Sequence, residues 1–218
     1  YAMPYLIDCM ALFWNKKLFR EAGLDPNKPP KDLEEMQAFA QKLTRTENNE
    51  ITVLGLQPVT DIMNVLCLFG AKLTDDSNTQ VLADSKEMTD GMSWYLETIQ
   101  KMGGFEKVNA YASGFGQAQG ANNPFFNGKV AMMISGEWIP NWINRYAPNL
   151  DYGVAPLPAP ANRPELARTT WLGGNMFAIP RSSKHPKEAK EILKWMQSDE
   201  AQVLLANLNN NVPNQKRV

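Results

Sequence analysis

The stretch 125-FFNGKVAMMISGEWIPNW-142 contains the change in composition on which the fold prediction rests. A short polar turn leads into the apolar run 129-KVAMMI-134, which predicts a buried strand. The strand ends at once in Gly136, Glu137 and Trp138. In open α/β sheets, ligands bind in the crevice at the carboxyl ends of the strands. A glycine, an acid and a large aromatic ring at this position therefore indicate a place where a ligand could bind.

Strands and helices alternate on both sides of this stretch. Before it, 6-LIDCMALFW-14 predicts a mostly buried strand, and Asn15 is suited to cap a helix over 16-KKLFREAG-23 that ends at Gly23. The other predicted helices are one with Leu33, Met36, Phe39, Ala40 and Leu43 on one face, one from Asp61 to Phe69, one from Ser85 with Met88, Met92, Tyr95, Leu96 and Ile99 on one face, one starting near Glu137, and two over 186–197 and 199–208. The other predicted strands cover 51-ITVLGL-56 and 151-DYGVAPL-157. The segment 171-WLGGNMFAIP-180 is predicted to form a strand, a glycine break and a second strand. This alternation predicts an α/β fold.

Composition excludes several classes of partner. The 218 residues carry 22 Lys and Arg against 23 Asp and Glu, a net charge of -1. Nucleic acids and anionic membranes need a concentrated basic surface, so neither is expected as the main partner. No apolar run approaches the roughly 18 residues that span a bilayer. The chain starts at Tyr1 with no signal-like segment, so we expect any targeting segment to have been trimmed or never to have existed.

Motifs for catalysis are weak in this sequence. The glycine-rich loop 114-GFGQAQG-120 misses the dinucleotide fingerprint by one residue, and neither a phosphate loop nor a Gly-x-Ser-x-Gly elbow occurs. Asp8 and Glu137 are candidates for a carboxylate pair in glycoside cleavage, a reading that we do not favour because acids are common in any chain. We therefore expect no enzyme and no cofactor.

The cysteines and the single histidine give no metal site. Cys9 and Cys67 both lie in apolar runs and are read as small core residues, although their pairing cannot be decided from sequence. His185 precedes Pro186 at a helix start and is expected to be solvated. With one histidine and no Cys-x-x-Cys, no zinc site is expected.

Two tryptophans stand where predicted strands end or begin. Trp138 follows a strand behind Gly136, and Trp171 stands one residue away from Gly173 and Gly174, on their amino-terminal side. A sugar ring has an apolar face and a hydroxyl edge, which suits an aromatic ring with polar neighbours. By chemistry alone, Trp138 fits equally well a stacking ring and an anchor at a helix start. Core or structural roles are predicted for the other tryptophans, which are Trp14, Trp94, Trp142 and Trp195.

The order of motifs over nearly the whole chain resembles the extracellular solute-binding proteins of carbohydrate ABC importers, the group that includes maltose- and maltodextrin-binding proteins. The motifs are 1-YAMPYLIDCMALFWNKKLFREAGL-24, 30-PKDLEEMQAFAQKL-43, 125-FFNGKVAMMISGEW-138, 171-WLGGNMFAIP-180 and 185-HPKEAKEILKWMQSDEAQ-202, and the least distinctive part is 103–124. The resemblance implies a periplasmic-binding-protein-like (type II) α/β fold, in which two lobes close around a sugar.

The resemblance also implies the residues of the site. Asp8 follows the first crossover near Tyr5, Trp138 takes the place of the family's stacking ring, and a Gly-Gly turn at the second crossover exposes backbone N–H groups. The ligand-binding residues that we expect are Tyr5, Asp8, Thr60, Asp61, Glu137, Trp138, Trp171, Gly173, Gly174 and Asn175. The loop 57-QPVTD-61 lacks an aromatic residue that maltose-binding proteins carry, which disfavours a maltose-type specificity.

The domain organisation follows from the same resemblance. Residues 1–8 are expected to form a crossover strand from the first lobe, 9–171 the second lobe, and 172–218 the second crossover with C-terminal helices of the first lobe. The family's N-terminal segment and last helices have no counterpart here, so the chain is expected to be a fragment. We then expect exposed apolar side chains in 175–218, covered by a partner chain or a swapped arrangement, or exposed by trimming.

Four functions are compatible with these observations. The favoured one is non-enzymatic capture of a mono- or oligosaccharide outside the cytoplasm, periplasmic or lipid-anchored, and delivery to the transmembrane subunits of an ABC importer. A second keeps the fold but binds a phosphorylated polyol or another polar solute, for which Arg168 is a candidate contact. The other two are a carbohydrate hydrolase and a purely structural surface protein.

Overall fold

The computed structural model describes residues 2–58, 62–115, 120–170, 172–209 and 212–213. The chain forms two compact units. Unit 1 consists of Tyr1–Cys9, Gly136–Trp142 and Leu172–Val218, and unit 2 of Met10–Ser135 and Ile143–Trp171.

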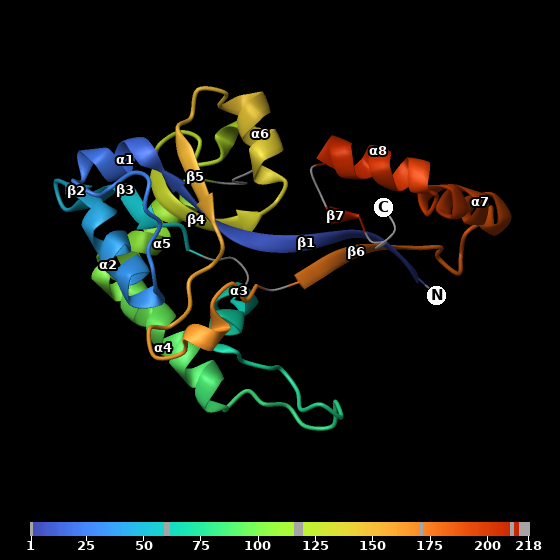
Figure 1. Ribbon diagram of the computed structural model, residues 1–218, viewed down its shortest axis with the longest axis horizontal. Helices are drawn as coiled ribbons and strands as arrows, with labels where there is room; N and C mark the ends of the chain where they lie inside the picture. Colours follow the sequence, from blue (N-terminus) through green and yellow to red (C-terminus); the bar gives the residue numbers. More distant parts are fainter. Residues whose placement is uncertain (1, 59–61, 116–119, 171, 210–211, 214–218) are drawn as a thin grey trace. The chain divides into compact units, whose positions relative to one another are not determined.

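Figure 1 labels the helices and strands of both units. The strands are β1 Ala2–Asn15, β2 Arg45–Glu47, β3 Glu50–Leu56, β4 Val130–Gly136, β5 Tyr152–Ala155, β6 Leu172–Ala178 and β7 Val212–Pro213. The helices are α1 Lys16–Glu21, α2 Leu33–Leu43, α3 Met63–Leu66, α4 Lys86–Lys101, α5 Phe105–Ser113, α6 Ile139–Tyr146, α7 Pro186–Met196 and α8 Asp199–Asn209, with short 3-10 turns at Cys67–Phe69, Gly120–Asn122 and Pro164–Leu166. None of these described helices is both long and apolar enough to cross a membrane.

In unit 2 the strands follow the order β2-β3-β4-β1-β5. β3 and β4 are parallel, with Leu54 opposite Val130 and Leu56 opposite Met132, while β5 runs antiparallel to β1. The carboxyl ends of β3 and β4 therefore meet at the same edge of the sheet. This mixed sheet agrees with the predicted α/β class.

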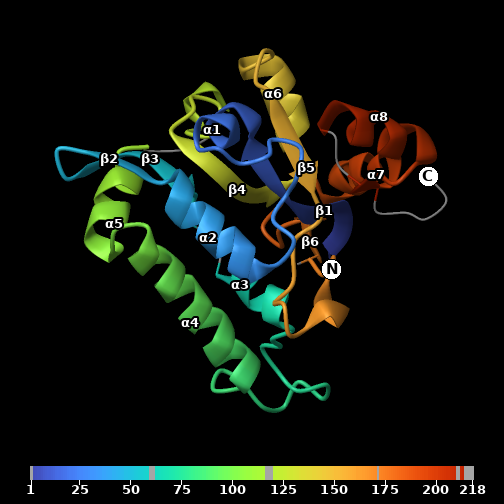
Figure 2. The ribbon, with the colours of Figure 1, turned by 60° about the vertical axis from the view of Figure 1, so that its left-hand side comes forward.

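Helices pack closely on the sheet of unit 2. A Cβ atom at Gly55 would lie 1.8 Å from the carbonyl oxygen of Ala40, so only glycine lets α2 approach β3 this closely. α2 also contacts α4, and Figure 2 shows these two helices side by side. The core between these layers is apolar, and its fully buried members include Leu12, Phe19, Leu33, Met36, Leu54, Val130 and Met132.

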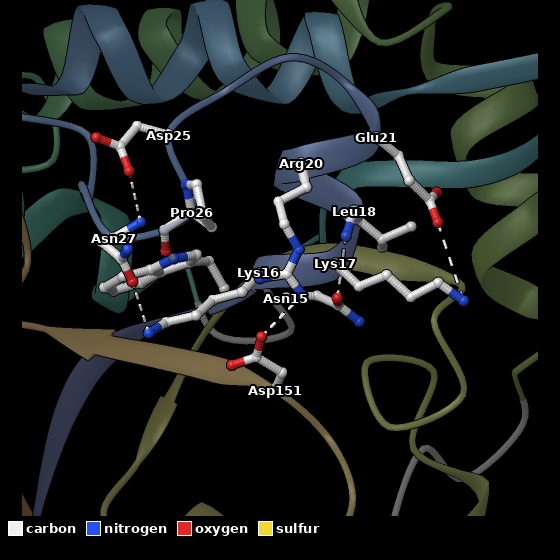
Figure 3. Close-up of polar contacts among 11 residues, drawn as sticks. Asn15, Lys16, Lys17, Leu18, Arg20, Glu21, Asp25, Pro26, Asn27 and Asp151 are labelled. Atoms are coloured by element: carbon white, nitrogen blue, oxygen red, sulfur yellow. Dashed lines mark hydrogen bonds and ion pairs between the residues drawn. The ribbon is translucent and has the colours of Figure 1, made fainter.

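The predicted start of the first helix is confirmed. Asn15 Oδ1 accepts a hydrogen bond from Leu18 N at 3.1 Å (Figure 3), and Gly23 has a φ of +67° just after the helix. The guanidinium of Arg20 lies 2.8 Å from a carboxylate oxygen of Asp151, which ties α1 to the segment before β5.

Unit 1 is built on the first part of β1. This part pairs antiparallel with β6, from Ala2 opposite Ala178 to Cys9 opposite Leu172, and with β7. α7 and α8 lie next to each other (Figure 1). α7 begins with Pro186 after His185, whose side chain is exposed, as the sequence predicts.

Many apolar side chains of unit 1 are exposed, which confirms the expectation for residues 175–218. They are Met176, Phe177, Ile192, Trp195, Val203, Leu204 and Leu208. Trp195 lies on α7 and is half exposed, and its predicted structural role stays a prediction. Trp14 and Trp94 are buried, as expected.

Other predictions need correction. β6 continues through Gly173 and Gly174 without the expected break, because both glycines are extended and take part in the ladder with β1. On α4, Met92 and Leu96 are exposed, while Gly91, Trp94 and Thr98 share the buried face with Met88 and Ile99. Gly91 allows this face of α4 to pack closely, since a Cβ atom at Gly91 would lie 3.1 Å from a methyl carbon of Leu66.

The cysteines differ from the predicted core residues. Cys9 and Cys67, both among the described residues, do not form a disulfide bond and are only partly buried. The helix expected from Asp61 to Phe69 is observed as α3 followed by the 3-10 turn Cys67–Phe69, and its expected first residue lies outside the described residues. β2 and α5 were not predicted.

Candidate ligand-binding site

Polar groups from three separate parts of the chain meet in unit 1. Asn175 Nδ2 on β6 donates a hydrogen bond to Asp8 Oδ2 on β1, at 3.2 Å. Glu137, between β4 and α6, accepts a hydrogen bond from the backbone N–H of Cys9 at 2.9 Å. We call Asp8, Cys9, Glu137 and Asn175 the polar cluster. It brings together three of the predicted site residues.

Strand register explains how Asn175 reaches Asp8. In the antiparallel pair, Asp8 stands opposite Gly173 and Leu6 opposite Asn175. Asp8 and Asn175 are thus diagonal neighbours on one face, a separation that polar side chains can bridge. Because Gly173 has no side chain, nothing from the residue opposite Asp8 stands between them. Gly173 therefore leaves room for the side chains of Asp8 and Asn175 to meet. The turn expected at Gly173 and Gly174 is not present.

The environment of the cluster changes its acid–base behaviour. Burial, and then the negative charge of Glu137, raise the pKa of Asp8 above its usual range. Burial also raises the pKa of the Cys9 thiol, and the charge of Glu137 and a hydrogen bond to it add to this effect. The thiol therefore stays protonated at neutral pH and donates to Glu137. The cluster offers carboxylate oxygens as hydrogen-bond acceptors.

The glycine in Gly136-Glu137-Trp138 makes room for the tryptophan ring. A Cβ atom at Gly136 would lie 2.0 Å from Trp138 Cζ3, so the indole occupies the space that any other side chain at position 136 would need. Trp138 is partly exposed and stands directly before α6, where its carbonyl oxygen accepts a hydrogen bond from Trp142 N at 3.2 Å. The ring is thus held on the end of β4. Stacking of a ligand on it stays a prediction.

The other predicted site residues are distributed as follows. Tyr5 lies on β1, with its ring centroid 4.4 Å from that of Phe177. Thr60, Asp61 and Trp171 lie outside the described residues. Sequence reasoning missed Cys9 as a member of the cluster, although its position next to Asp8 was a usable signal.

The described parts of the chain bear on the expectations for a metal site and for a phosphate contact. No group of three or more His, Cys, Asp or Glu side chains is arranged there to hold a metal ion. Arg168, the candidate phosphate contact, lies in a loop of unit 2 with a φ of +68°, and its backbone N–H donates to Leu157 O.

A hollow of about 590 Å³ lies on unit 2, and none of the described residues that line it is a predicted site residue. Its lining includes Ile51, Lys107, Tyr111, Phe115 and Lys129. The hydroxyl of Tyr111 donates to Thr52 O at 2.6 Å, so the polar end of this ring is already used within the fold.

Comparison with known proteins gives the family. The model of the bacterial extracellular solute-binding protein family matches residues 1–203. The chain belongs to this family. Its relatives include a putative binding protein of Brucella abortus, 28% identical over 200 residues, and the sn-glycerol-3-phosphate-binding periplasmic protein of Yersinia pestis, 25% identical over 201 residues. Each match covers 90% of this chain but only 46% and 44% of the relative, so the chain spans about half the length of these solute-binding proteins.

A solved solute-binding structure is more similar still. The chain is 36% identical to CpMnBP1 with mannotriose bound, with a TM-score of 0.86, over 98% of this chain and 55% of that one. The same protein was also solved with mannobiose. The predicted periplasmic-binding-protein-like α/β fold is thereby confirmed.

Proposed function

We propose that the protein captures a manno-oligosaccharide outside the cytoplasm and delivers it to the membrane subunits of an ABC importer, without chemical conversion. The observation that carries this proposal is the 36% identity, over nearly the whole chain, to a protein solved with mannotriose bound. Solute-binding proteins of this family bind and release their ligands, and this supports a non-enzymatic role.

The polar cluster suits the hydroxyl edge of a sugar. The carboxylates of Asp8 and Glu137 would accept hydrogen bonds from hydroxyl groups, and charge-assisted bonds of this kind are stronger than neutral ones. Asn175 and the backbone at Gly173 and Gly174 would add polar contacts, and Trp138 would stack on the apolar face of a sugar ring. The assignment of 1–8, 9–171 and 172–218 to two lobes is part of the proposal. A ligand that contacts both lobes would favour the closed state by its differential affinity.

The first test is a titration of tryptophan fluorescence in the full-length protein. Mannobiose and mannotriose are expected to give a saturable change at micromolar concentration, which corresponds to about −8 kcal/mol. Maltose and glycerol 3-phosphate serve as comparison ligands. A response to glycerol 3-phosphate alone would replace the sugar by a phosphorylated polyol. No response to any of them, with the protein shown to be folded, would reject the proposal.

Replacing the stacking ring tests the site itself. Trp138→Ala is expected to weaken mannotriose binding by about 1–3 kcal/mol, roughly 5- to 150-fold, because a buried aromatic contact is lost. Trp195→Ala, which removes a half-exposed ring on α7, is the matched control and should bind as the wild type does. Equal affinity of the Trp138 variant and the wild type would remove this ring from the site.

One specific observation favours the second candidate, a phosphorylated polyol. The Yersinia relative carries glycerol 3-phosphate in its name. Against it, the two carboxylates of the polar cluster, Asp8 and Glu137, would repel a phosphate group. The hydrolase alternative uses the same two carboxylates, and turnover of a chromogenic mannoside would establish it.

A further inference from the structure

The hollow of about 590 Å³ on unit 2 lies at the amino-terminal ends of two parallel strands. It is lined by Glu50 and Ile51, where β3 begins, and by Lys129, the residue directly before β4. The carboxyl ends of the same strands, at which open α/β sheets bind ligands, form the opposite edge of the sheet. The hollow is therefore separate from a ligand site at that edge, and its volume falls within the range of about 300–1,000 Å³ that small-molecule sites occupy.

The floor of the hollow is apolar. α5 packs against β3 along it, and Figure 2 shows the two elements side by side. Ile51 is buried, and the rings of Tyr111 and Phe115 meet edge-on with their centroids 5.0 Å apart. Ala110 and Gly114, four residues apart, also line the hollow, and their small size keeps the space beside the two rings open. A lining of this kind suits an apolar group of a ligand.

Four charged side chains line the same hollow. They are Glu50, Glu106, Lys107 and Lys129, and none of them belongs to an ion pair among the described residues. The ammonium of Lys107 donates instead to the side-chain oxygen of Asn49 at 2.5 Å. Opposite charges thus line one hollow without neutralising one another, which suits a ligand that carries both signs.

One end of the hollow carries an excess of negative charge. The contact between Lys107 and Asn49 joins the start of α5 to the residue before β3. Glu106, in the first turn of the helix, and Glu50, the first residue of β3, lie at this same end. Two carboxylates against one ammonium that already has a partner favour a cationic group of a ligand here.

Lys129 supplies the positive charge at the other end. Its carbonyl oxygen accepts hydrogen bonds from Leu54 N at 2.9 Å and from the Tyr111 hydroxyl at 3.2 Å, which fix its backbone. Leu54 is four residues along β3 from Glu50, and a strand rises about 3.3 Å per residue, so the two ends are about 13 Å apart along the strand. A peptide of three residues spans about 10 Å between its terminal charges. The flexible Lys and Glu side chains can bridge the remaining distance.

We propose that this hollow is a second binding site and takes a short peptide of about three residues. The ammonium of the peptide lies toward Glu50 and Glu106, its carboxylate lies toward Lys129, and an apolar side chain packs on the rings of Tyr111 and Phe115. A sugar has no charges for the two ends, and a phosphorylated polyol carries only one sign. The inference does not rest on the proposed function, because it concerns another edge of the sheet.

The first test is calorimetry of the full-length protein with the tripeptide Ala-Phe-Ala, in the absence of sugar. Saturable binding is expected, with a Kd on the order of 10–100 μM. The N-acetylated and the C-amidated peptides each lack one terminal charge and should bind about 5-fold more weakly. Gly-Gly-Gly, which lacks the apolar side chain, should bind at least about 10-fold more weakly. Equal affinities for the free and the capped peptides, or no saturable binding by the folded protein, would overturn the proposal.

Variants test whether the peptide occupies the hollow. Lys129→Met should lower the affinity for Ala-Phe-Ala about 5-fold and leave that for the C-amidated peptide unchanged, whereas Lys129→Arg should bind as the wild type does. Ala110→Leu fills the floor and should weaken binding at least about 10-fold. Asn109→Leu, which changes an exposed residue of α5 outside the lining, is the matched control. Unchanged affinity in Ala110→Leu, or equal losses in the Ala110 and Asn109 variants, would show that the peptide binds elsewhere.

Discussion

Unit 2 has a closed apolar core, whereas unit 1 keeps many apolar side chains in contact with solvent. Leu54 in unit 2 is 0% exposed, while Leu208 in unit 1 is 61% exposed. The polar cluster nevertheless lies in unit 1, where the register of β1 and β6 positions Asp8 and Asn175. The comparison teaches that the candidate site is placed by strand pairing, while the stability of the chain comes mainly from burial elsewhere.

The largest expected effect is a difference between two identical truncations. Leu54→Ala should lower the free energy of unfolding by about 2–5 kcal/mol, because it opens a cavity in a packed core. Leu208→Ala should change it by less than about 0.5 kcal/mol, because the side chain is exposed. Urea denaturation of both variants measures the two values. Similar losses at the two positions would show that Leu208 is covered in solution.

A second pair of variants separates stability from binding. Gly136→Ala would push a methyl group into the ring of Trp138, so mannotriose affinity should fall by about 1–3 kcal/mol, as for loss of the ring itself. Gly153→Ala makes the same kind of clash in unit 2, where a Cβ atom would lie 2.0 Å from Trp14 Cζ2. It should lower the Tm without changing the affinity of the folded protein, as measured by calorimetry.

The effect of Gly136→Ala on mannotriose affinity can be checked in a double variant. In a protein that already carries Trp138→Ala, the Gly136→Ala change should have no further effect on affinity, because the ring it displaces is gone. Additive losses would mean that Gly136 acts on binding by another route.

The smallest expected effect is a dependence of stability on pH. The pKa of Asp8 is raised in the folded protein, so stability is lost as the pH rises from about 4 through the raised value. Asp8→Asn should therefore be more stable than the wild type at neutral pH, by less than about 1 kcal/mol given the partial exposure, and equally stable below about pH 4. The same variant should bind mannotriose more weakly.

Asp75 in unit 2 is a control for which the pH dependence of stability has the opposite sign. The Ser77 hydroxyl and the backbone N–H of Gln80 hold the pKa of Asp75 well below its usual range. Asp75→Asn should thus lose stability at neutral pH and match the wild type only in strong acid. Thermal melts between pH 3 and pH 7 compare both variants, and a shift of the same sign in the two would contradict the assignment.

Regular elements with strong signals could be predicted from the sequence. Asn15, Ser85 and the apolar spacing of Leu33 to Leu43 each specify a helix by capping or periodicity, and all three helices are observed. The sequence did not predict α5, because this helix begins after Gly104 without a capping side chain and buries only Val108.

Three of the residues predicted to bind a ligand meet in the structure, but their mutual contacts could not be predicted. Asp8, Glu137 and Asn175 were expected to contact a ligand, yet their mutual approach depends on the register that puts Gly173 opposite Asp8. Register of this kind depends on pairing between residues far apart in sequence.

The long first strand also has a consequence for the order of folding. Residues of β1 up to Asn15 are synthesised before the rest of unit 2, and Leu12 to Asn15 can pair with β5 once that strand has been made. Residues 2–9 must wait for β6 and β7, which follow the whole of unit 2 along the chain. Contacts between such distant segments form slowly, and an unpaired strand edge invites association with other chains. During synthesis, unit 2 can therefore complete its core while residues 2–9 still lack β6 and β7 as partners.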